Sequence, residues 1–209
     1  MEKFNWDTLF CENGTSWGME PSDSALLIAN VFQKEQLMRV LIPGVGYGRN
    51  AIPFMNAGLK VKGIEISQEA IALARDNGIN FPIQQGSVID MPFDSERVDG
   101  IFCYCLLHLF EPLQRKQILE ACYQQLANDG MMYFVVVSTQ ADMYSQGTCI
   151  GPDFYLLENG LSVFFYNERS IEQDFSDFGL VEYRPFEEPI KHLPSSVPLK
   201  CFLVKCVKH

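Results

Sequence analysis

Short apolar runs alternate with amphipathic segments along the first two thirds of the chain. Nearly continuous apolar residues predict five strands, at 38–43, 60–67, 79–86, 97–105 and 131–138. Apolar residues at helical spacing, with start and stop signals at the ends, predict helices at 23–32, 49–58, 68–78 and 112–130. Because strands that alternate with helices form a parallel sheet covered on both faces, the pattern predicts a doubly wound α/β fold.

The pattern changes after residue 138. Residues 139–167 are irregular and rich in glycine and aromatic residues, which is typical of an insert that covers a substrate. A helix is predicted at 168–179, followed by strands at 180–188 and 198–208 that would pair as an antiparallel hairpin and complete a mostly parallel, seven-stranded sheet. We expect one domain with four parts: an amino-terminal helical and aromatic lid segment (1–35), a ligand-binding core (36–140), a substrate-covering insert (141–167), and a closing helix and hairpin (168–209).

Length and charge narrow the functional classes. At 209 residues, of which 47% are hydrophobic, the chain is long enough for one well-buried domain and short for two. Its formal net charge is −10, from 16 basic and 26 acidic residues without a basic cluster, whereas nucleic-acid-binding proteins use lysine and arginine against phosphate. We therefore expect a small-molecule substrate and no nucleic-acid partner, in a monomer or a weak dimer.

The sequence shows no membrane-spanning segment and no secretion signal. No apolar run approaches the ~20 residues of a membrane span. The start, MEKFNWDTLF, lacks the basic region and apolar core of a secretion signal. We expect a cytoplasmic protein without a membrane partner.

The cysteines predict neither disulfides nor a metal site. None of the seven is in a C-x-x-C pair, and most lie in apolar segments, where free cysteine behaves as a small hydrophobic residue. Cys103, Cys105 and His108 have the residue types of a metal site. However, two cysteines two apart on a strand point the same way, while His108 belongs to the following segment, so we expect no metal.

Gly44, Gly46 and Gly48 follow the first predicted strand at alternate positions, in the segment RVLIPGVGYGRNA. In open α/β sheets a ligand binds beyond the carboxyl end of this strand, where glycine lets the backbone approach it closely. The dinucleotide fingerprint G-x-G-x-x-G requires glycine at position 49, where this chain has Arg49. The observed G-x-G-x-G is the variant associated with S-adenosylmethionine (SAM). We therefore expect SAM as the cofactor, with a nicotinamide-dependent oxidoreductase as the less favoured alternative.

Glu65 ends the second predicted strand, about 20 residues after the loop. An acid there can accept hydrogen bonds from both ribose hydroxyls of a nucleoside, whereas the alternative is a strand-end carboxylate that faces solvent. After the third strand, the segment GSVIDMPF places the Ser87 hydroxyl and the Val88 backbone where they could meet the edge of an adenine ring. Asp90 in the same segment fits a turn cap better than a ligand contact.

Five segments taken together resemble the core of class I SAM-dependent methyltransferases over about residues 36–140: RVLIPGVGYGRNA, VKGIEIS, GSVIDMPF, VDGIFCYCLLHLFEP and LANDGMMYFVVV. Most such enzymes carry an acid two residues before the first glycine, where this chain has Ile42. LIPGVGYG is instead similar to the thiopurine, thiol and halide methyltransferases, as is an amino-terminal aromatic pattern matched by Trp6, Phe10 and Trp17. The insert and the carboxy-terminal end also look like those of tellurite-resistance methyltransferases.

The resemblance implies that Trp6, Phe10 and Trp17 form an aromatic wall for the positively charged sulfur of SAM. The alternative is an amino-terminal segment that merely packs on the core. By the same pattern, Ile66 and Cys103 are expected to contact the cofactor.

Tyr104, at the end of the fourth predicted strand, and His108, which follows that strand, are the candidate catalytic residues. His108 would be the general base if one is used, although a structural role in the turn LLHLF is the alternative. Thiopurine-type relatives tend to have arginine at the position of Tyr104, and its absence argues against an anionic thiopurine substrate. The insert offers further candidates for the substrate pocket: Asp142, Tyr144, Phe154 and Tyr155.

The resemblance implies in-line methyl transfer from SAM to a small molecule. The acceptor atom would be a soft sulfur, selenium or tellurium nucleophile or a halide, which hardly needs a general base. The main alternative is a SAM-binding sensor or scaffold without turnover, which the glycine loop and Glu65 would serve equally well.

Overall fold

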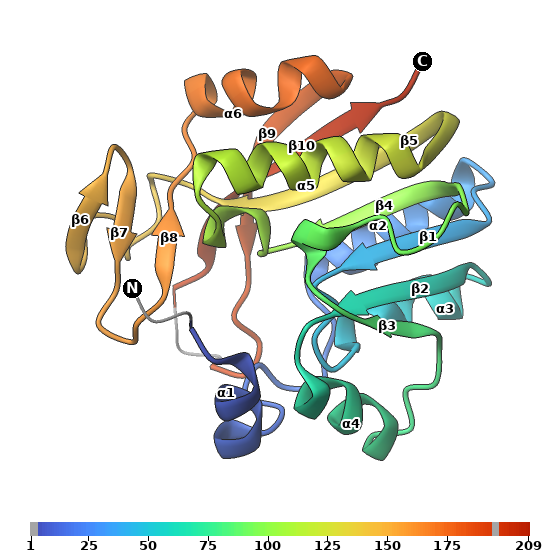
Figure 1. Ribbon diagram of the computed structural model, residues 1–209, viewed down its shortest axis with the longest axis horizontal. Coiled ribbons are helices and arrows are strands. Elements are labelled where there is room, and N and C mark those ends of the chain that lie inside the picture. Colours follow the sequence, from blue (N-terminus) through green and yellow to red (C-terminus); the bar gives the residue numbers. More distant parts are fainter. Residues whose placement is uncertain (1–3, 194–196) are drawn as a thin grey trace.

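The computed structural model of the protein describes residues 4–193 and 197–209, which contain a seven-stranded sheet between helices (Figure 1). Its strand order is β3-β2-β1-β4-β5-β10-β9. The strands are β1 (Arg39–Pro43), β2 (Lys60–Glu65), β3 (Ile83–Gln85), β4 (Val98–Tyr104), β5 (Leu126–Val137), β9 (Leu180–Glu188) and β10 (Leu199–Val207). The first five pair in parallel, and β10 is antiparallel to both β5 and β9. The predicted doubly wound sheet with an antiparallel carboxy-terminal hairpin is confirmed.

Helices cover both faces of this sheet. The α-helices are α1 (Trp6–Asn13), α2 (Asp23–Lys34), α3 (Ile52–Asn56), α4 (Gln68–Asp76), α5 (Pro112–Gln125) and α6 (Glu168–Phe175). One apolar core includes buried residues of α5 and α6, and a second includes buried residues of α2 and α3. Each sheet face is therefore sealed by its own pair of helices, and Figure 1 shows α5 and α2 on opposite sides of β4.

The helix predicted at 112–130 is wrong at its carboxyl end, because α5 stops at Gln125 and β5 begins at Leu126. Leu126 is buried and pairs with Val98 of β4. The Lys208 ammonium donates hydrogen bonds to three carbonyls at the end of the helix, those of Tyr123, Gln124 and Leu126. Pairing with distant strands and this cap therefore override the local helical pattern.

Three further predictions differ in detail. The predicted helix at 49–58 is a 3-10 turn, η1 (Arg49–Ala51), followed by the short α3, and β3 covers only Ile83–Gln85 of the predicted strand. The insert, expected to be irregular, folds as a three-stranded antiparallel sheet of β6 (Thr148–Gly151), β7 (Phe154–Leu156) and β8 (Ser162–Phe164). Figure 1 shows this small sheet beside the carboxyl ends of the parallel strands.

Candidate active site

A cavity of about 1410 Å³ lies at the carboxyl ends of the parallel strands. Its walls come from the glycine loop after β1, the ends of β2 and β4, the amino-terminal segment, the insert, and the connection between β9 and β10. It is larger than the roughly 300–1,000 Å³ of a site for one small ligand. The cavity therefore has room for a cofactor and a second molecule.

The glycine loop takes backbone conformations that favour glycine. Gly44 and Gly46 line the cavity at φ angles of 62° and 58°. A Cβ on Gly44 would lie 2.7 Å from the side chain of Leu106. Gly48 also has a positive φ, of 84°, but it packs against Ile79 and Phe81 and is not part of the cavity wall. Gly48 therefore shapes the turn, whereas the two earlier glycines can expose backbone to a ligand.

Glu65 is held at the cavity wall by backbone hydrogen bonds. Its Oε2 accepts from the N–H of Gly46 at 2.8 Å, and its Oε1 accepts from the N–H of Ser67 at 2.8 Å. The side chain is buried, and this burial raises the pKa of the carboxyl above its usual value, although the backbone donors act in the opposite direction. Each carboxylate oxygen accepts two hydrogen bonds readily, so Glu65 can still receive one more on each side.

The predicted aromatic residues Trp6, Phe10 and Trp17 all line the cavity. The Phe10 ring lies 5.6 Å from that of Trp17 and 6.0 Å from that of Tyr47. Trp17 stacks on Tyr47 at 6.3 Å, and the Tyr47 hydroxyl donates to the carbonyl of Gly18 at 2.7 Å. Tyr47, which the sequence analysis overlooked inside the glycine loop, therefore anchors this aromatic wall to β1.

Asp7 ties α1 to the start of α4. Its Oδ1 accepts hydrogen bonds from the Ser67 hydroxyl at 2.7 Å and from the N–H of Glu69 at 3.2 Å, and these donors lower the pKa of the Asp7 carboxyl. Figure 1 shows α1 beside α4 at the lower edge of the molecule. The sequence analysis did not predict this contact, although Asp7 directly follows the candidate residue Trp6.

The predicted adenine contacts Ser87 and Val88 lie at the cavity, as does Ile66, which was expected only to contact the cofactor. Ser87 precedes the 3-10 turn η2 (Val88–Asp90), and its hydroxyl accepts from the N–H of Ile89 at 3.4 Å. Ser87 and not Asp90 is therefore the cap of this turn, because the capping side chain must precede the first orphan N–H groups.

The two cysteines and the histidine around the end of β4 have different environments. Cys103 is buried in the apolar core and does not line the cavity, whereas Cys105 does. His108 lies in the cavity wall, and its Nδ1 accepts from the N–H of Val137 at 3.4 Å. Burial lowers the pKa of His108 to about 3. This environment favours a neutral, structural histidine over the general base considered from the sequence.

Tyr104 lines the cavity and keeps its proton, since burial raises the pKa of its phenol well above the usual value. The Arg49 guanidinium lies over its ring, 5.7 Å from the centroid. Arg49 also lines the cavity, and its Nη1 donates to the carbonyl of Glu20 at 2.8 Å. The sequence analysis treated Arg49 only as a departure from the dinucleotide pattern, so this role was missed.

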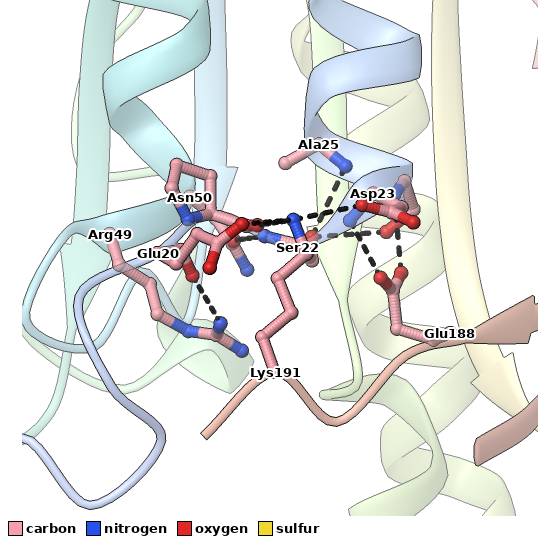
Figure 2. A network of polar contacts seen from close by, with 10 residues as sticks. Glu20, Ser22, Asp23, Ala25, Arg49, Asn50, Glu188 and Lys191 are labelled. Carbon is pink, nitrogen blue, oxygen red and sulfur yellow. Dashed lines mark hydrogen bonds and ion pairs between the residues drawn. The ribbon is translucent and has the colours of Figure 1, made fainter. Parts of the chain in front are cut away.

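Figure 2 shows Arg49, Glu188 and Lys191 converging near the first turn of α2. The Glu188 carboxylate is buried and accepts from the backbone N–H groups of Asp23 at 2.6 Å and Ser24 at 3.2 Å. The Lys191 ammonium lies 2.8 Å from the carboxylate of Asp23 and 3.1 Å from that of Glu20.

Glu188 and Lys191 both line the cavity. No local pattern marks these two residues, because they come from the end of β9 and the connection that follows it. They thus fasten this connection to the start of α2.

The insert contributes mainly apolar side chains. The cavity wall includes Phe154, Leu156, Leu157, Leu161 and Val163. Three other candidates named from the sequence do not line it. Asp142 faces Lys200 at 3.7 Å, and Tyr144 packs edge-on against Tyr155.

The structure offers no metal centre within residues 4–193 and 197–209, where no group of three or more histidine, cysteine, aspartate or glutamate side chains could hold an ion. All seven cysteines are free thiols. In the same part of the chain, no helix is long and apolar enough to cross a membrane.

Sequence comparison places a methyltransferase domain in this region. A family model described as a methyltransferase domain matches residues 40–130. The chain is 26% identical over 156 residues to the tRNA N(3)-methylcytidine methyltransferase Mettl2 of Drosophila melanogaster, covering 66% of this chain and 47% of that protein. It is 26% identical over 113 residues to the putative methyltransferase GWCH70_2453 of Geobacillus sp. (strain WCH70), covering 52% and 46%. The chain thus spans about half the length of the curated relatives it matches.

Solved structures share the fold at low identity. A Burkholderia thailandensis 1,6-didemethyltoxoflavin-N1-methyltransferase, determined with S-adenosylhomocysteine, superposes with a TM-score of 0.70 at 17% identity, covering 96% of this chain and 84% of that one. TehB from Haemophilus influenzae superposes with a TM-score of 0.65 at 14% identity, covering 97% and 67%. These similarities establish the Rossmann-like methyltransferase fold.

The site itself fits SAM. The backbone of Gly44 and Gly46, the buried carboxylate of Glu65 and the aromatic wall at Trp17 all face one cavity, as a nucleoside with a positively charged sulfur requires. The matching domain model, the fold and this constellation agree. Residues 40–130 therefore match a methyltransferase domain, within a fold that the chain shares with solved Rossmann-like methyltransferases.

Proposed function

We propose that the protein transfers a methyl group from SAM to a small organic acceptor by in-line displacement. The observation that carries this proposal is the continuous cavity from Glu65 at the end of β2, past Tyr104 at the end of β4, to the apolar insert. Such a cavity can hold two reactants in one dry space. Alignment of two bound reactants supplies several kcal/mol of a barrier, ~7–11 kcal/mol at the extreme.

Each part of the site has a task in this proposal. Glu65 accepts hydrogen bonds from the ribose hydroxyls, and Ser87 and Val88 contact the adenine edge. Trp6 and Trp17 offer aromatic faces, which stabilise a nearby cation by ~0.5–2 kcal/mol. When bound, SAM supplies an electrophilic methyl group on a sulfonium. The chain's own residues therefore bind, orient and exclude water.

The described wall offers no evident general base. His108 stays neutral and uses its Nδ1 as an acceptor. The wall carboxylates Asp7, Glu65, Glu111 and Glu188 accept hydrogen bonds from backbone or hydroxyl donors. We therefore favour a soft nucleophile that needs little help with a proton, a thiol or its selenium or tellurium counterpart, as in the thiopurine, thiol and halide branch.

The dimensions of the cavity favour an organic acceptor. A halide or tellurite anion would leave the apolar surface of the insert uncovered, whereas an organic thiol would cover it. The formal charge of −10 opposes an RNA substrate, although a curated relative is named as a tRNA methyltransferase.

The test has two stages. Calorimetry with S-adenosylhomocysteine measures cofactor binding, with NADH as the comparison ligand. Labelled SAM is then offered with thiols, thiopurines, halides, tellurite and tRNA. We expect S-adenosylhomocysteine to bind and label to appear on an organic thiol. Binding of NADH in its place would overturn the cofactor assignment. Label on tRNA would overturn the acceptor class, and binding without transfer to any acceptor would favour a non-catalytic sensor.

A further inference from the structure

Arg49 is a cation in the cavity wall. Within residues 4–193 and 197–209 it has no carboxylate ion-pair partner. The other long basic side chain of the wall, Lys191, is paired with both Glu20 and Asp23. Since no carboxylate pairs with this half-buried guanidinium among the described residues, an anion bound in the cavity could supply its counterion.

The position of the Arg49 side chain is set by two neutral groups. The carbonyl of Glu20 accepts one hydrogen bond from Nη1 at 2.8 Å, and the guanidinium carbon lies over the Tyr104 ring, 5.7 Å from its centroid. A guanidinium carries five N–H donors in a planar fork. Most of these donors remain available, and the fork matches a carboxylate in two-point contact.

Arg49 lies over Tyr104, on the other side of β1 from Glu65, the residue proposed to bind the nucleoside. Glu65 ends β2 and Tyr104 ends β4, and these two strands flank β1 on opposite sides. Tyr104 belongs to the apolar cluster that also contains Leu157, Leu161 and Val163 of the insert. Arg49 therefore stands where the acceptor half of the cavity meets its apolar wall.

Building on the proposed function, we propose that Arg49 determines acceptor specificity by binding an anionic group, a carboxylate or its equivalent, on an otherwise apolar acceptor. The body of the acceptor packs against Phe154, Leu157 and Leu161 of the insert, and the anion pairs with the guanidinium over Tyr104. The sequence analysis argued against an anionic thiopurine acceptor, because position 104 is tyrosine where thiopurine-type relatives tend to have arginine. The fold brings a cation to the same place from position 49.

The experiment measures binding to the protein saturated with S-adenosylhomocysteine. The probes are benzoate, naphthalene-2-carboxylate and anthracene-2-carboxylate, each paired with its uncharged amide, and the measurement is calorimetry. We expect at least one acid to bind about tenfold or more tightly than its amide, because a hydrogen-bonded charge pair replaces a neutral contact. Arg49→Gln should abolish this preference.

Arg184→Gln is the matched control. Arg184 also lies over an aromatic ring, 5.5 Å from the centroid of Phe186, but it does not line this cavity. The control removes the same charge and the same kind of ring contact, so the preference for the acid should persist. If it disappears in both variants, the effect comes from net charge alone and the proposal is overturned.

A second arm of the experiment tests whether Arg49 binds an anionic group of the acceptor or the carboxylate of the cofactor. S-adenosylhomocysteine carries an amino-acid carboxylate, and 5′-methylthioadenosine lacks it. If Arg49→Gln weakens S-adenosylhomocysteine about tenfold and leaves 5′-methylthioadenosine unchanged, the partner is the cofactor and the acceptor proposal is overturned. Equal binding of acids and amides to the unmodified protein, or no binding of any acid, also overturns it.

These outcomes are distinct from failure of the proposed function, in which S-adenosylhomocysteine would not bind to the unmodified protein at all. Thermal unfolding of Arg49→Gln and Arg49→Lys shows whether either variant remains folded. Arg49→Lys keeps the charge but loses the fork, so it should retain only part of the preference for the acid.

Discussion

The Glu65 carboxylate accepts a hydrogen bond from the backbone N–H of Gly46 at 2.8 Å, which joins the end of β2 to the loop that follows β1. The same carboxylate accepts a hydrogen bond from the N–H of Ser67 at 2.8 Å. One buried acid thus links the loop after β1 to the residues that follow β2. Its position is therefore set before any ligand arrives.

We predict that Glu65→Gln weakens S-adenosylhomocysteine binding by about 10–100-fold, because hydrogen bonds to a charged group are worth ~1.5–3 kcal/mol each. Calorimetry measures the affinity and thermal unfolding the stability. Glu120→Gln, an exposed acid on α5, is the control for the change in charge. Unchanged affinity in Glu65→Gln would mean that the ribose lies elsewhere.

Asp7 should hold α1 against the start of α4. Asp7→Ala removes the acceptor of the Ser67 hydroxyl and of the Glu69 N–H, so α1 should exchange its amide hydrogens faster. The lowered pKa of Asp7 means that its contribution is present above the unfolded value of about 3.9 and is lost as pH falls through the folded pKa. Hydrogen exchange by mass spectrometry at pH 7 tests the variant. Thr8→Ala, on the same helix, should leave the Asp7 contacts intact.

His108 should make stability depend on pH. Its folded pKa of about 3 lies below the unfolded value of about 6.5, so the unfolded chain binds more protons between these values. Unfolding free energy should therefore fall as pH drops below about 6.5, by up to ~1.4 kcal/mol per pH unit from this group. Urea unfolding at pH 7.5 and pH 5 measures the loss.

His108→Gln should remove most of that pH dependence, whereas His209→Gln at the exposed carboxy terminus should not. An equal loss of stability in all three proteins would show that other groups are responsible.

Arg115 should hold the insert and α6 to α5. It is buried, lies 2.8 Å from the Asp174 carboxylate, and places its guanidinium 3.8 Å from the centre of the Phe164 ring. Arg115→Ala should destabilise the protein by ~3 kcal/mol, because it leaves the partly exposed Asp174 carboxylate without its buried partner and removes packing. Arg39→Ala, which breaks the exposed pair with Asp99, should destabilise the protein far less. Urea unfolding compares the two, and equal effects would contradict the argument.

Local patterns in the sequence determined the order of strands and helices, the glycine loop and the acid at position 65. These features depend on apolar periodicity, on turn residues and on a spacing within one β-α-β unit, all of which are visible over a few tens of residues. The strands at 180–188 and 199–207 followed the same rule, and their antiparallel pairing was correctly predicted.

Tertiary structure alone decided the end of α5 at Gln125, the folding of the insert into a small sheet, and the placement of Arg49 over Tyr104. Each depends on partners far apart in the chain, as with Glu188 and the N–H of Asp23, which are separated by 165 positions. Such contacts leave no local periodicity, because their energy appears only once the sheet has brought the segments together. The sequence by itself therefore determined the cofactor side of the cavity, and only the fold decided what faces the acceptor.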